Sequence, residues 1–396
     1  MQRNPCFKQY SHDYLFVEIG KRVQAFEQTH PDANLISLGV GDTTEPLPSS
    51  IVDEIVKKAR ELGTREGYRG YPSSVGDREL REKIAECIYC NTISPDEIFI
   101  SDGAKCDIGR FQWLFGKKTT MTVQDPSYPV YTATHFLSGK KKVYTLSCCP
   151  KNNFFPKIEN FPRTDLIYLC SPNNPTGTVL THDQLERIVT IAKRTKAFIL
   201  FDAAYAAYIR DPALPQTIYE ISGAKEVAIE VGSFSKLAGF SGVRLGWTVI
   251  PKTVCFDEGT WVGKDWTTIV TTFFNGVSHL SKAGGLAALT DEGRRATRAI
   301  CDSYLANAAL LRKTMEAIGY KCYGGVNAPY LWVDLNGGSS WEIFDNFLRR
   351  AHLITTPGVG FGKGGEGYLR LSAFGEKERI LEASCRLQSV CSLRNS

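Results

Sequence analysis

Through the middle of the chain, hydrophobic residues occur in two patterns that alternate along the sequence. Short apolar runs typical of strands are separated by stretches whose apolar residues recur at helical spacing, as at Leu185, Ile188 and Val189. Because strands and amphipathic helices alternate, the pattern predicts an α/β fold with a mostly parallel sheet between helices. The predicted strands lie at Ile98–Ser101, Thr120–Val123, Lys142–Leu146, Leu166–Leu169 and Ala197–Phe201.

Three local signals mark where helices begin or end. Ser50 is expected to cap a helix, and Thr181 with Gln184 forms a capping-box pattern before another. A long helical pattern from Arg294 stops at Gly319, a suitable residue just after a helix end.

The pattern of the sequence changes after about residue 275. A long helical pattern and then shorter mixed elements replace the alternation of strands and helices. This change predicts a second, smaller α+β domain. We therefore expect an N-terminal arm with part of the small domain at residues 1–34, a large domain at residues 35–280 and a small C-terminal domain at residues 281–396.

The stretch around Lys236 combines one lysine with hydroxyl groups, glycines and an arginine, since Ser233 and Ser235 precede it and Arg244 follows. A desolvated lysine beside another cation has a lowered pKa, and its neutral amine can attack an aldehyde such as that of pyridoxal 5′-phosphate. Serine hydroxyls and an arginine fork suit the phosphate. The S-x-S-K pattern alone also fits an exposed basic loop. Apolar runs on both sides favour the cofactor anchor, because they predict strands that hold the loop.

Other polar residues follow predicted strands, where ligands gather in sheets of this kind. Asp202 comes directly after one strand and can pair with a pyridine nitrogen, with Tyr205 in reach of the same ring. A helix N-cap explains Asp202 equally well. Asn174 lies between two prolines, and Tyr128 does too, where its ring can stack on a heterocycle. At Ala104 a strand-to-helix junction can present backbone N–H groups to a phosphate.

One further motif resembles a dinucleotide-binding loop. Residues 360–365 fit G-x-G-x-x-G, but a strand pattern follows where that function needs a helix, so we do not expect dinucleotide binding.

Composition and charge exclude several classes of protein. The net charge of +5 is spread over many positions, and the densest cluster, residues 140–142, has no interleaved aromatic residue, so no nucleic-acid partner is expected. No apolar run is long enough to cross a membrane and the first residues lack a signal-peptide core, so the cytoplasm is expected. The cysteines are expected to be reduced, with no role assigned to Cys148 and Cys149, and the histidines predict no metal site.

Three motifs occur in a recognisable order: S-P-N-N-P-T-G at residues 171–177, Asp202 with Tyr205, and S-F-S-K followed by R-L-G-W between residues 233 and 247. Together they resemble the fold type I aminotransferases of class I and II. Further stretches at residues 15–19, 39–46, 101–107 and 325–330 resemble the LL-diaminopimelate aminotransferase family. The resemblance implies a homodimer with shared active sites, whose large domain binds pyridoxal 5′-phosphate. It also implies transamination between LL-2,6-diaminopimelate and 2-oxoglutarate, giving tetrahydrodipicolinate and glutamate.

The resemblance also implies roles for individual residues. Lys236, Asp202 and Tyr205 would be catalytic, and Tyr71 and Asn275 would enter the partner subunit's site. The implied cofactor-binding residues are Tyr71, Ala104, Lys105, Tyr128, Asn174, Asp202, Tyr205, Ser233, Ser235, Lys236 and Arg244. The implied substrate-binding residues are Tyr14, Gly41, Lys105, Tyr128, Asn174, Asn275 and Arg370.

The cofactor motifs alone leave neighbouring functions open. Aminotransferases for aromatic amino acids, aspartate or alanine, and related lyases, share them. A cofactor-sensing transcription regulator is disfavoured, because the segment before Leu35 is too short for a winged-helix domain and linker. Ser74 stands near the place of an acid that the family uses for the distal ammonium, so looser selectivity between LL and meso substrates is expected.

Overall fold

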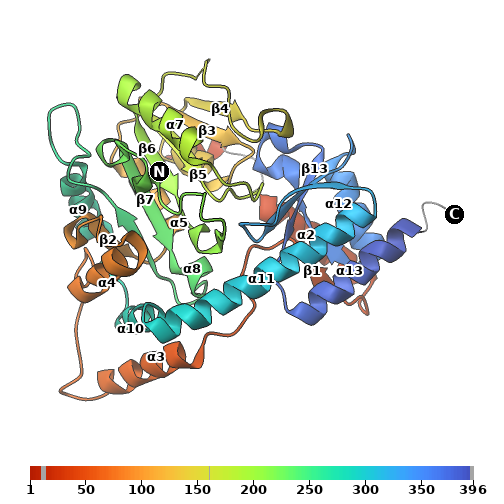
Figure 1. The fold of residues 1–396 in the computed structure, drawn as a ribbon, viewed down its shortest axis with the longest axis horizontal. Coiled ribbons are helices and arrows are strands. Elements are labelled where there is room, and N and C mark those ends of the chain that lie inside the picture. Colours follow the sequence, from red (N-terminus) through yellow and green to blue (C-terminus); the bar gives the residue numbers. More distant parts are fainter. Residues whose placement is uncertain (10–14, 160, 393–396) are drawn as a thin grey trace.

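A seven-stranded sheet forms the centre of the computed structural model, which describes residues 1–9, 15–159 and 161–392 (Figure 1). Strand β8 runs antiparallel to both of its neighbours, and the other neighbouring pairs are parallel. The predicted mostly parallel sheet is therefore confirmed. The strand order is β2 (Ile98–Ser101), β8 (Gly246–Val249), β7 (Ala228–Ser233), β6 (Phe198–Asp202), β5 (Leu166–Cys170), β3 (Met121–Asp125) and β4 (Val143–Ser147).

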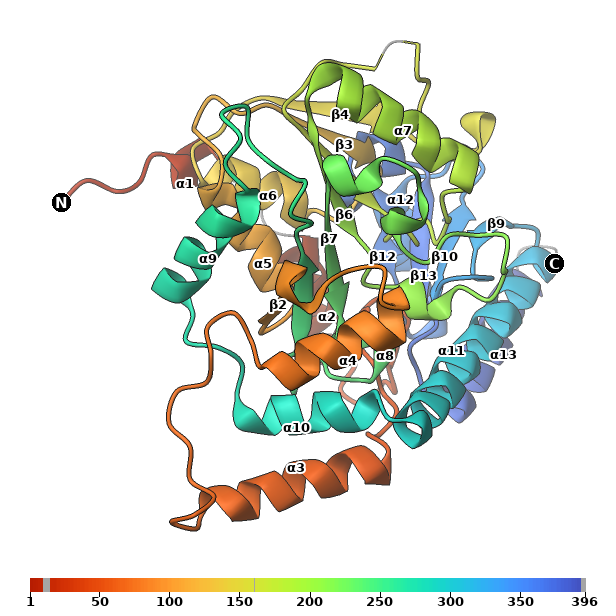
Figure 2. The ribbon, with the colours of Figure 1, turned by 60° about the vertical axis from the view of Figure 1, so that its left-hand side comes forward.

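Helices cover both faces of this sheet, because its strands are apolar on both faces. Ile167 and Leu169 of β5 belong to one hydrophobic core, whereas Tyr168 and Cys170 belong to the other. Figure 2 shows α3 alongside α10, with α4 on the opposite side of α10. The helices of this part are α3 (Ser49–Leu62), α4 (Arg78–Tyr89), α5 (Ala104–Arg110), α6 (Val130–Leu137), α7 (His182–Thr195), α8 (Phe234–Leu237), α9 (Val262–Phe273) and α10 (His279–Ala288), and α1 (Cys6–Gln9) contacts α6.

The long helix α11 (Asp291–Ala317) connects this part of the molecule to a second sheet (Figure 1). That sheet has the order β12 (Thr356–Pro357), β13 (Tyr368–Ser372), β10 (Tyr330–Asp334) and β9 (Lys321–Gly324). Strand β1 (Ile36–Ser37) pairs with β11 (Leu353–Ile354), and the third core joins α2 (Leu15–Thr29) to α12 (Ser340–Ala351) and α13 (Lys377–Ser392). The N-terminal segment therefore packs with the C-terminal part of the chain.

The local helix signals have mixed outcomes. Thr181 caps α7 through the predicted capping box, and Gly319 follows the end of α11 with a φ of 91°. The expected cap at Ser50 is wrong, because α3 already begins at Ser49 after Pro48, whose position has no side-chain cap. Residues 358–365 form two short 3₁₀ helices before β13, so the helix that a dinucleotide loop needs is absent from this described stretch.

The cysteines from Cys6 to Cys385 are free thiols, as expected. They include Cys87 and Cys90, which have C-x-x-C spacing at the end of α4. Among the described helices, none combines the length and apolar character that a membrane span requires.

Candidate functional site

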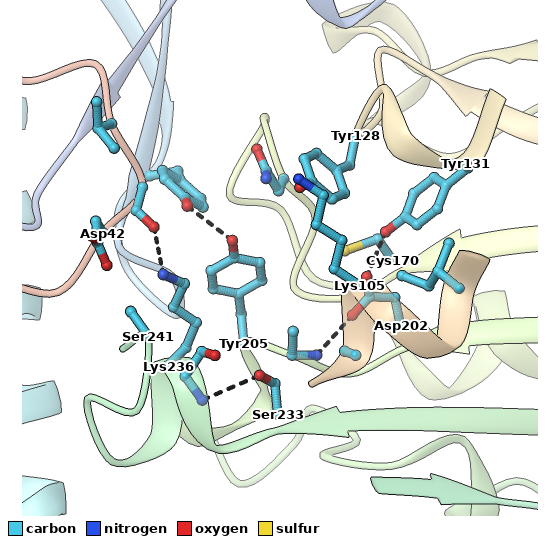
Figure 3. Close-up of a pocket in the computed structure, with 18 of the residues that line it drawn as sticks. Asp42, Lys105, Tyr128, Tyr131, Cys170, Asp202, Tyr205, Ser233, Lys236 and Ser241 are labelled. Carbon is cyan, nitrogen blue, oxygen red and sulfur yellow. Dashed lines mark hydrogen bonds between the residues drawn. The ribbon is translucent and has the colours of Figure 1, made fainter. Parts of the chain in front are cut away.

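A cavity of about 310 Å³ opens where the carboxyl ends of β5, β6 and β7 meet. Neighbouring parallel strands end at the same edge, so Asn174, Asp202 and Ser233 come together although they are distant in sequence. Figure 3 shows Lys236 on one side of the cavity and Asp202 on the other, with Tyr205 between them. The sheet topology therefore brings three separate motifs to one site.

Lys236 lies on α8, the short helix that directly follows β7. Desolvation by burial lowers the pKa of its amine to about 8, and the nearby cations Arg370 and Arg244 act in the same direction, while Asp42 opposes them. The amine donates a hydrogen bond to the carbonyl oxygen of Gly41 and lies 5.0 Å from the centroid of the Phe374 ring. A large fraction of Lys236 is therefore neutral near pH 8, as a nucleophilic amine must be.

Asp202 is 6% exposed at the end of β6 and is held by two hydrogen bonds. The Tyr131 hydroxyl donates to one carboxylate oxygen at 2.7 Å, and the Ala204 N–H donates to the other at 3.0 Å. Burial raises the pKa of Asp202, and these two hydrogen bonds oppose that shift. No cation pairs with Asp202 within the part of the chain that the structure describes. A buried carboxylate of this kind suits a protonated ligand nitrogen.

Tyr205 is buried, and its hydroxyl lies 2.9 Å from the hydroxyl of Tyr330. Burial raises the pKa of Tyr205 well above its usual range, so the phenol is protonated at neutral pH. Gly41 lies against the same Tyr330 hydroxyl, since a Cβ at Gly41 would be 2.1 Å from that oxygen. This close approach explains why a glycine is needed in the loop that faces Lys236.

Arg370 lies on β13 and is 1% exposed, yet its guanidinium is only partly satisfied. One nitrogen donates to Asn174 Oδ1 at 2.7 Å and another donates to the Gly39 carbonyl oxygen. The Nε atom has no hydrogen-bond partner among the described residues. A buried guanidinium with an unsatisfied donor is suited to a carboxylate of a ligand. Because Asn174 Oδ1 accepts from Arg370, the amide nitrogen of Asn174 can serve as a donor.

The phosphate-sized end of the cavity is built from hydroxyls and an arginine. Arg244 donates to Ser235 Oγ at 3.2 Å, and Ser233 Oγ accepts from the backbone N–H of Ser235 at 3.1 Å. Gly103 fits closely beside them, because a Cβ there would lie 2.4 Å from an Arg244 nitrogen. Donors and a permanent cation thus line one end of the cavity, while Asp202 lines another part.

Pyridoxal 5′-phosphate fits this set of residues. The cavity offers an amine with a lowered pKa for its aldehyde, a buried carboxylate without a cation for its ring nitrogen, and an arginine with two hydroxyls for its phosphate. The residues that would hold it are Lys236, Asp202, Asn174, Tyr205, Tyr128, Ala104, Lys105, Ser233, Ser235 and Arg244.

Most of the residues predicted from the sequence line this one cavity. Tyr71 and Asn275 do not, since Tyr71 is 87% exposed and Asn275 is also exposed. Their loops lie together, because a Cβ at Gly276 would be 2.4 Å from the carbonyl oxygen of Ser73. Tyr14 lies outside the described residues. The predicted residues in the lining are Gly41, Ala104, Lys105, Tyr128, Asn174, Asp202, Tyr205, Ser233, Ser235, Lys236, Arg244 and Arg370.

The sequence reasoning missed two tyrosines in the site. Tyr131 bonds to Asp202, and Tyr330 bonds to Tyr205. A signal existed for Tyr131. It lies three positions after Tyr128, at the start of α6, and a spacing of three residues lets the two rings contact each other. For Tyr330 the signal was weaker, since β10 belongs to a different sheet from the other motifs.

Comparisons with known proteins agree with this geometry. The family model described as aminotransferase class I and II matches residues 33–387. The chain is 48% identical to an LL-diaminopimelate aminotransferase of Protochlamydia amoebophila over 98% of this chain and 97% of that protein, and 46% identical to a chloroplastic one of Arabidopsis thaliana over 98% and 87%. The solved structure of L,L-diaminopimelate aminotransferase from Chlamydomonas reinhardtii has a TM-score of 0.95 and 48% identity, and covers 98% of each chain. The fold is fold type I, and the chain belongs to the aminotransferase class I and II family.

Proposed function

We propose that the protein transfers an amino group between LL-2,6-diaminopimelate and 2-oxoglutarate, giving tetrahydrodipicolinate and glutamate, with pyridoxal 5′-phosphate as cofactor. The observation that carries this proposal is the set of Lys236, Asp202 and Arg370 around one cavity. Curated relatives of this substrate class, 43% to 48% identical over nearly the whole chain, support the choice of substrate.

The bound cofactor supplies an electron sink that stabilises the carbanion formed at the substrate's Cα. Lys236 is the covalent anchor and, as a free amine, the base that accepts the Cα proton. Its pKa of about 8 suits both tasks, because a general base is most effective when its pKa lies near the working pH. The Gly41 carbonyl oxygen that accepts from the amine keeps Nζ aimed into the cavity.

Asp202 would hold a proton on the ring nitrogen of the cofactor, and the hydrogen bond from Tyr131 would keep the carboxylate oriented for this. The phenol of Tyr205 and the amide nitrogen of Asn174 are the groups that would donate to the phenolic oxygen of the ring. Tyr330 fixes the position of the Tyr205 hydroxyl. Tyr128, which lines the cavity, would pack against the ring, as aromatic side chains do against flat heterocycles.

Arg370 binds the α-carboxylate of either substrate through its fork of N–H groups. Both LL-diaminopimelate and glutamate have this group, so one arginine serves both halves of the reaction. The partners Asn174 and Gly39 already fix the guanidinium plane, which reduces the entropy lost when the carboxylate binds.

The distal end of diaminopimelate has its own charged amino acid group, for which Glu45 is a candidate partner; Tyr14, the other candidate, lies outside the described residues. The loop that carries Glu45 is fixed, because its backbone N–H and that of Thr44 both donate to the Tyr304 hydroxyl at 2.7 Å. Ser74 offers no charge for the distal ammonium. A site without a fixed polar contact discriminates weakly. Selectivity for LL over meso diaminopimelate is therefore modest.

We further propose a homodimer in which Tyr71 and Asn275 enter the partner's site. The exposed loops that carry these residues lie against each other. Phe273, two residues before Asn275, contacts Trp113 through tilted rings with centroids 5.3 Å apart, and both rings are exposed. Exposed aromatic pairs of this kind are typical of interfaces. Mixing Lys236→Ala with Tyr71→Ala protein tests the idea: hybrid dimers place both lesions in one site, so activity should return. No recovery from two stable, separately inactive variants contradicts shared sites.

An amino-donor panel with purified holoenzyme and 2-oxoglutarate tests the substrate. LL-diaminopimelate should give the highest kcat/KM, with the meso isomer slower by a modest factor and with aspartate, alanine and phenylalanine far behind. Turnover of aspartate or phenylalanine without either diaminopimelate isomer refutes the proposed substrate. A wholly inert meso isomer refutes only the Ser74 argument. If the Ser74 argument holds, Ser74→Asp should increase the preference for the LL over the meso isomer. Ser73→Asp, at the exposed neighbouring residue, should not change this preference.

A further inference from the structure

A second cavity of about 310 Å³ lies behind α8 and shares no lining residue with the first. The two are connected through the backbone of α8, because Lys236 lines the first cavity and Leu237 lines the second. Helices α8 and α11 and the short 3₁₀ helix at Ala206–Tyr208 pack together around it. Its apolar floor includes Ile88, Leu237 and Leu289. A cavity with such a floor has room for an aliphatic group.

Arg210 presents a preorganised cation to this cavity. Its guanidinium donates to Asp302 at 2.7 Å and to the Ala207 carbonyl oxygen at 2.7 Å, which fixes its plane. Asn327 Oδ1 accepts the backbone N–H of Arg210 at 2.8 Å and so fixes the loop as well. The remaining Nη2 atom is buried and has no hydrogen-bond partner among the described residues. Because Nη2 has almost no accessible surface, Arg210 contributes a fixed positive charge to the cavity and not a direct donor at this atom.

Three more arginines line the cavity from the first turns of α11. Arg294 and Arg298 are four positions apart and share one face of the helix, and Arg295 is beside them. Within the described residues no ion pair joins these three side chains to an acid. Asp291 is the one acid in the lining, so the cavity has a clear excess of positive charge. The positive end of the helix dipole adds to it.

We propose that this cavity binds a small organic anion: a carboxylate with a short aliphatic stem. Arg294, Arg295 and Arg298 bind the carboxylate, the fixed positive charge of Arg210 attracts it, and the floor around Leu237 takes up the stem. Inorganic anions would satisfy the arginines but leave the apolar floor uncovered. The site is distinct from the one that contains Arg370.

The cavity is close enough to the catalytic lysine for the ligand to influence it. Leu237 directly follows Lys236, and the thiol of Cys301, which lines the cavity, lies 3.8 Å from the Lys236 carbonyl oxygen. A ligand packed on Leu237 and Cys301 therefore contacts α8, the segment that positions Lys236. It does so from the side of α8 that faces away from the active site.

The probe for the test is 6-bromohexanoate, because bromine can be located by anomalous scattering. Crystals of the holoenzyme soaked with it should show a bromine peak between Leu237 and Leu289, separate from any peak at Arg370. In solution, titration calorimetry should detect a binding event that Arg294→Gln/Arg298→Gln weakens about tenfold or more, since each charge-assisted hydrogen bond contributes substantially. Arg187→Gln removes an exposed arginine of α7 outside this cavity and should leave that event unchanged.

Three outcomes overturn the proposal: no bromine peak in the cavity, a peak that appears only at crystal concentration without a matching event in solution, or equal binding by the double variant and the wild type. Equal affinity for inorganic phosphate also overturns it, because the apolar floor would then contribute nothing. None of these outcomes depends on transamination activity, so they do not bear on the proposed substrate.

Discussion

Asp202→Asn separates the two roles that the position can have. An amide keeps the shape of the side chain, and its oxygen can still accept the Ala204 N–H that Asp202 accepts at 3.0 Å. The amide cannot carry the negative charge that holds a proton on the cofactor's ring nitrogen. The helix-cap alternative for Asp202 is wrong, because the next helix begins at Ala206 with Tyr205 at its N-cap position. The role that survives the substitution is the turn contact with the Ala204 N–H, whereas the electrostatic role does not survive.

The expected loss follows from the burial of Asp202. The carboxylate is 6% exposed, so its partner on the cofactor is shielded from water, and removing one member of such a buried pair costs about 3 to 5 kcal/mol. If this cost applies to the transition state, kcat should fall by roughly two to three and a half orders of magnitude. If Asp202 served only the turn at Ala204, the substitution would cost at most about 1 kcal/mol of stability and leave the rate almost unchanged.

Single-turnover and steady-state transamination, with cofactor content measured by absorbance and the melting temperature by calorimetry, distinguish these cases. We expect a folded variant that retains most of its cofactor and reacts far more slowly. A variant with full cofactor content and a rate within about tenfold of wild type would show that Asp202 only supports the turn at Ala204. A variant that is slow because it has lost its cofactor should recover at high cofactor concentration, which separates binding from chemistry.

Two further substitutions and one chemical labelling experiment test other buried groups and the cofactor anchor. Tyr131→Phe removes the hydroxyl that donates to Asp202 at 2.7 Å, so kcat should fall by about tenfold, and an unchanged rate and pH profile would exclude a positioning role. Burial raises the pKa of Glu230 to about 7, so protonation of Glu230 stabilises the fold fully below about pH 4.5, and this contribution is lost as the pH rises through 7. Glu230→Gln cannot titrate, so its melting temperature should rise relative to that of the wild type between pH 5.5 and 8.5. Parallel curves for the two proteins would contradict this. Borohydride treatment should attach the cofactor permanently to Lys236, as peptide mapping can establish, and a label on Lys105 would disprove the anchor.

The sequence was sufficient for the parts of the fold that depend on local pattern. Alternating apolar runs identify the parallel strands, and the capping box at Thr181 places the start of α7 correctly. The cap at Ser50 failed because Pro48 fits the position before a helix through its fixed φ, without any side-chain hydrogen bond. A pattern of capping side chains cannot detect that kind of helix start.

Contacts between distant segments were much harder to predict. Arg370 was expected to bind a carboxylate, but the sequence gives no sign that Asn174 and Gly39 hold it, since these residues come from three separate parts of the chain. The pairing of Tyr330 with Tyr205 depends in the same way on how β10 packs against the end of β6. Register and packing between sheets decide such contacts, and neither leaves a periodic signal in one sequence.

One physical cause, burial, prepares the main groups of the site for opposite tasks. Burial lowers the pKa of Lys236 and raises the pKa of Asp202, because it disfavours the charged form of each. Lys236 needs its neutral form to act as nucleophile and base, so the shift helps it directly. Asp202 needs its charged form, so the Tyr131 and Ala204 donors must offset the shift until the cofactor brings a positive charge. The tyrosine on α6 is therefore as much a part of the site as the carboxylate that it supports.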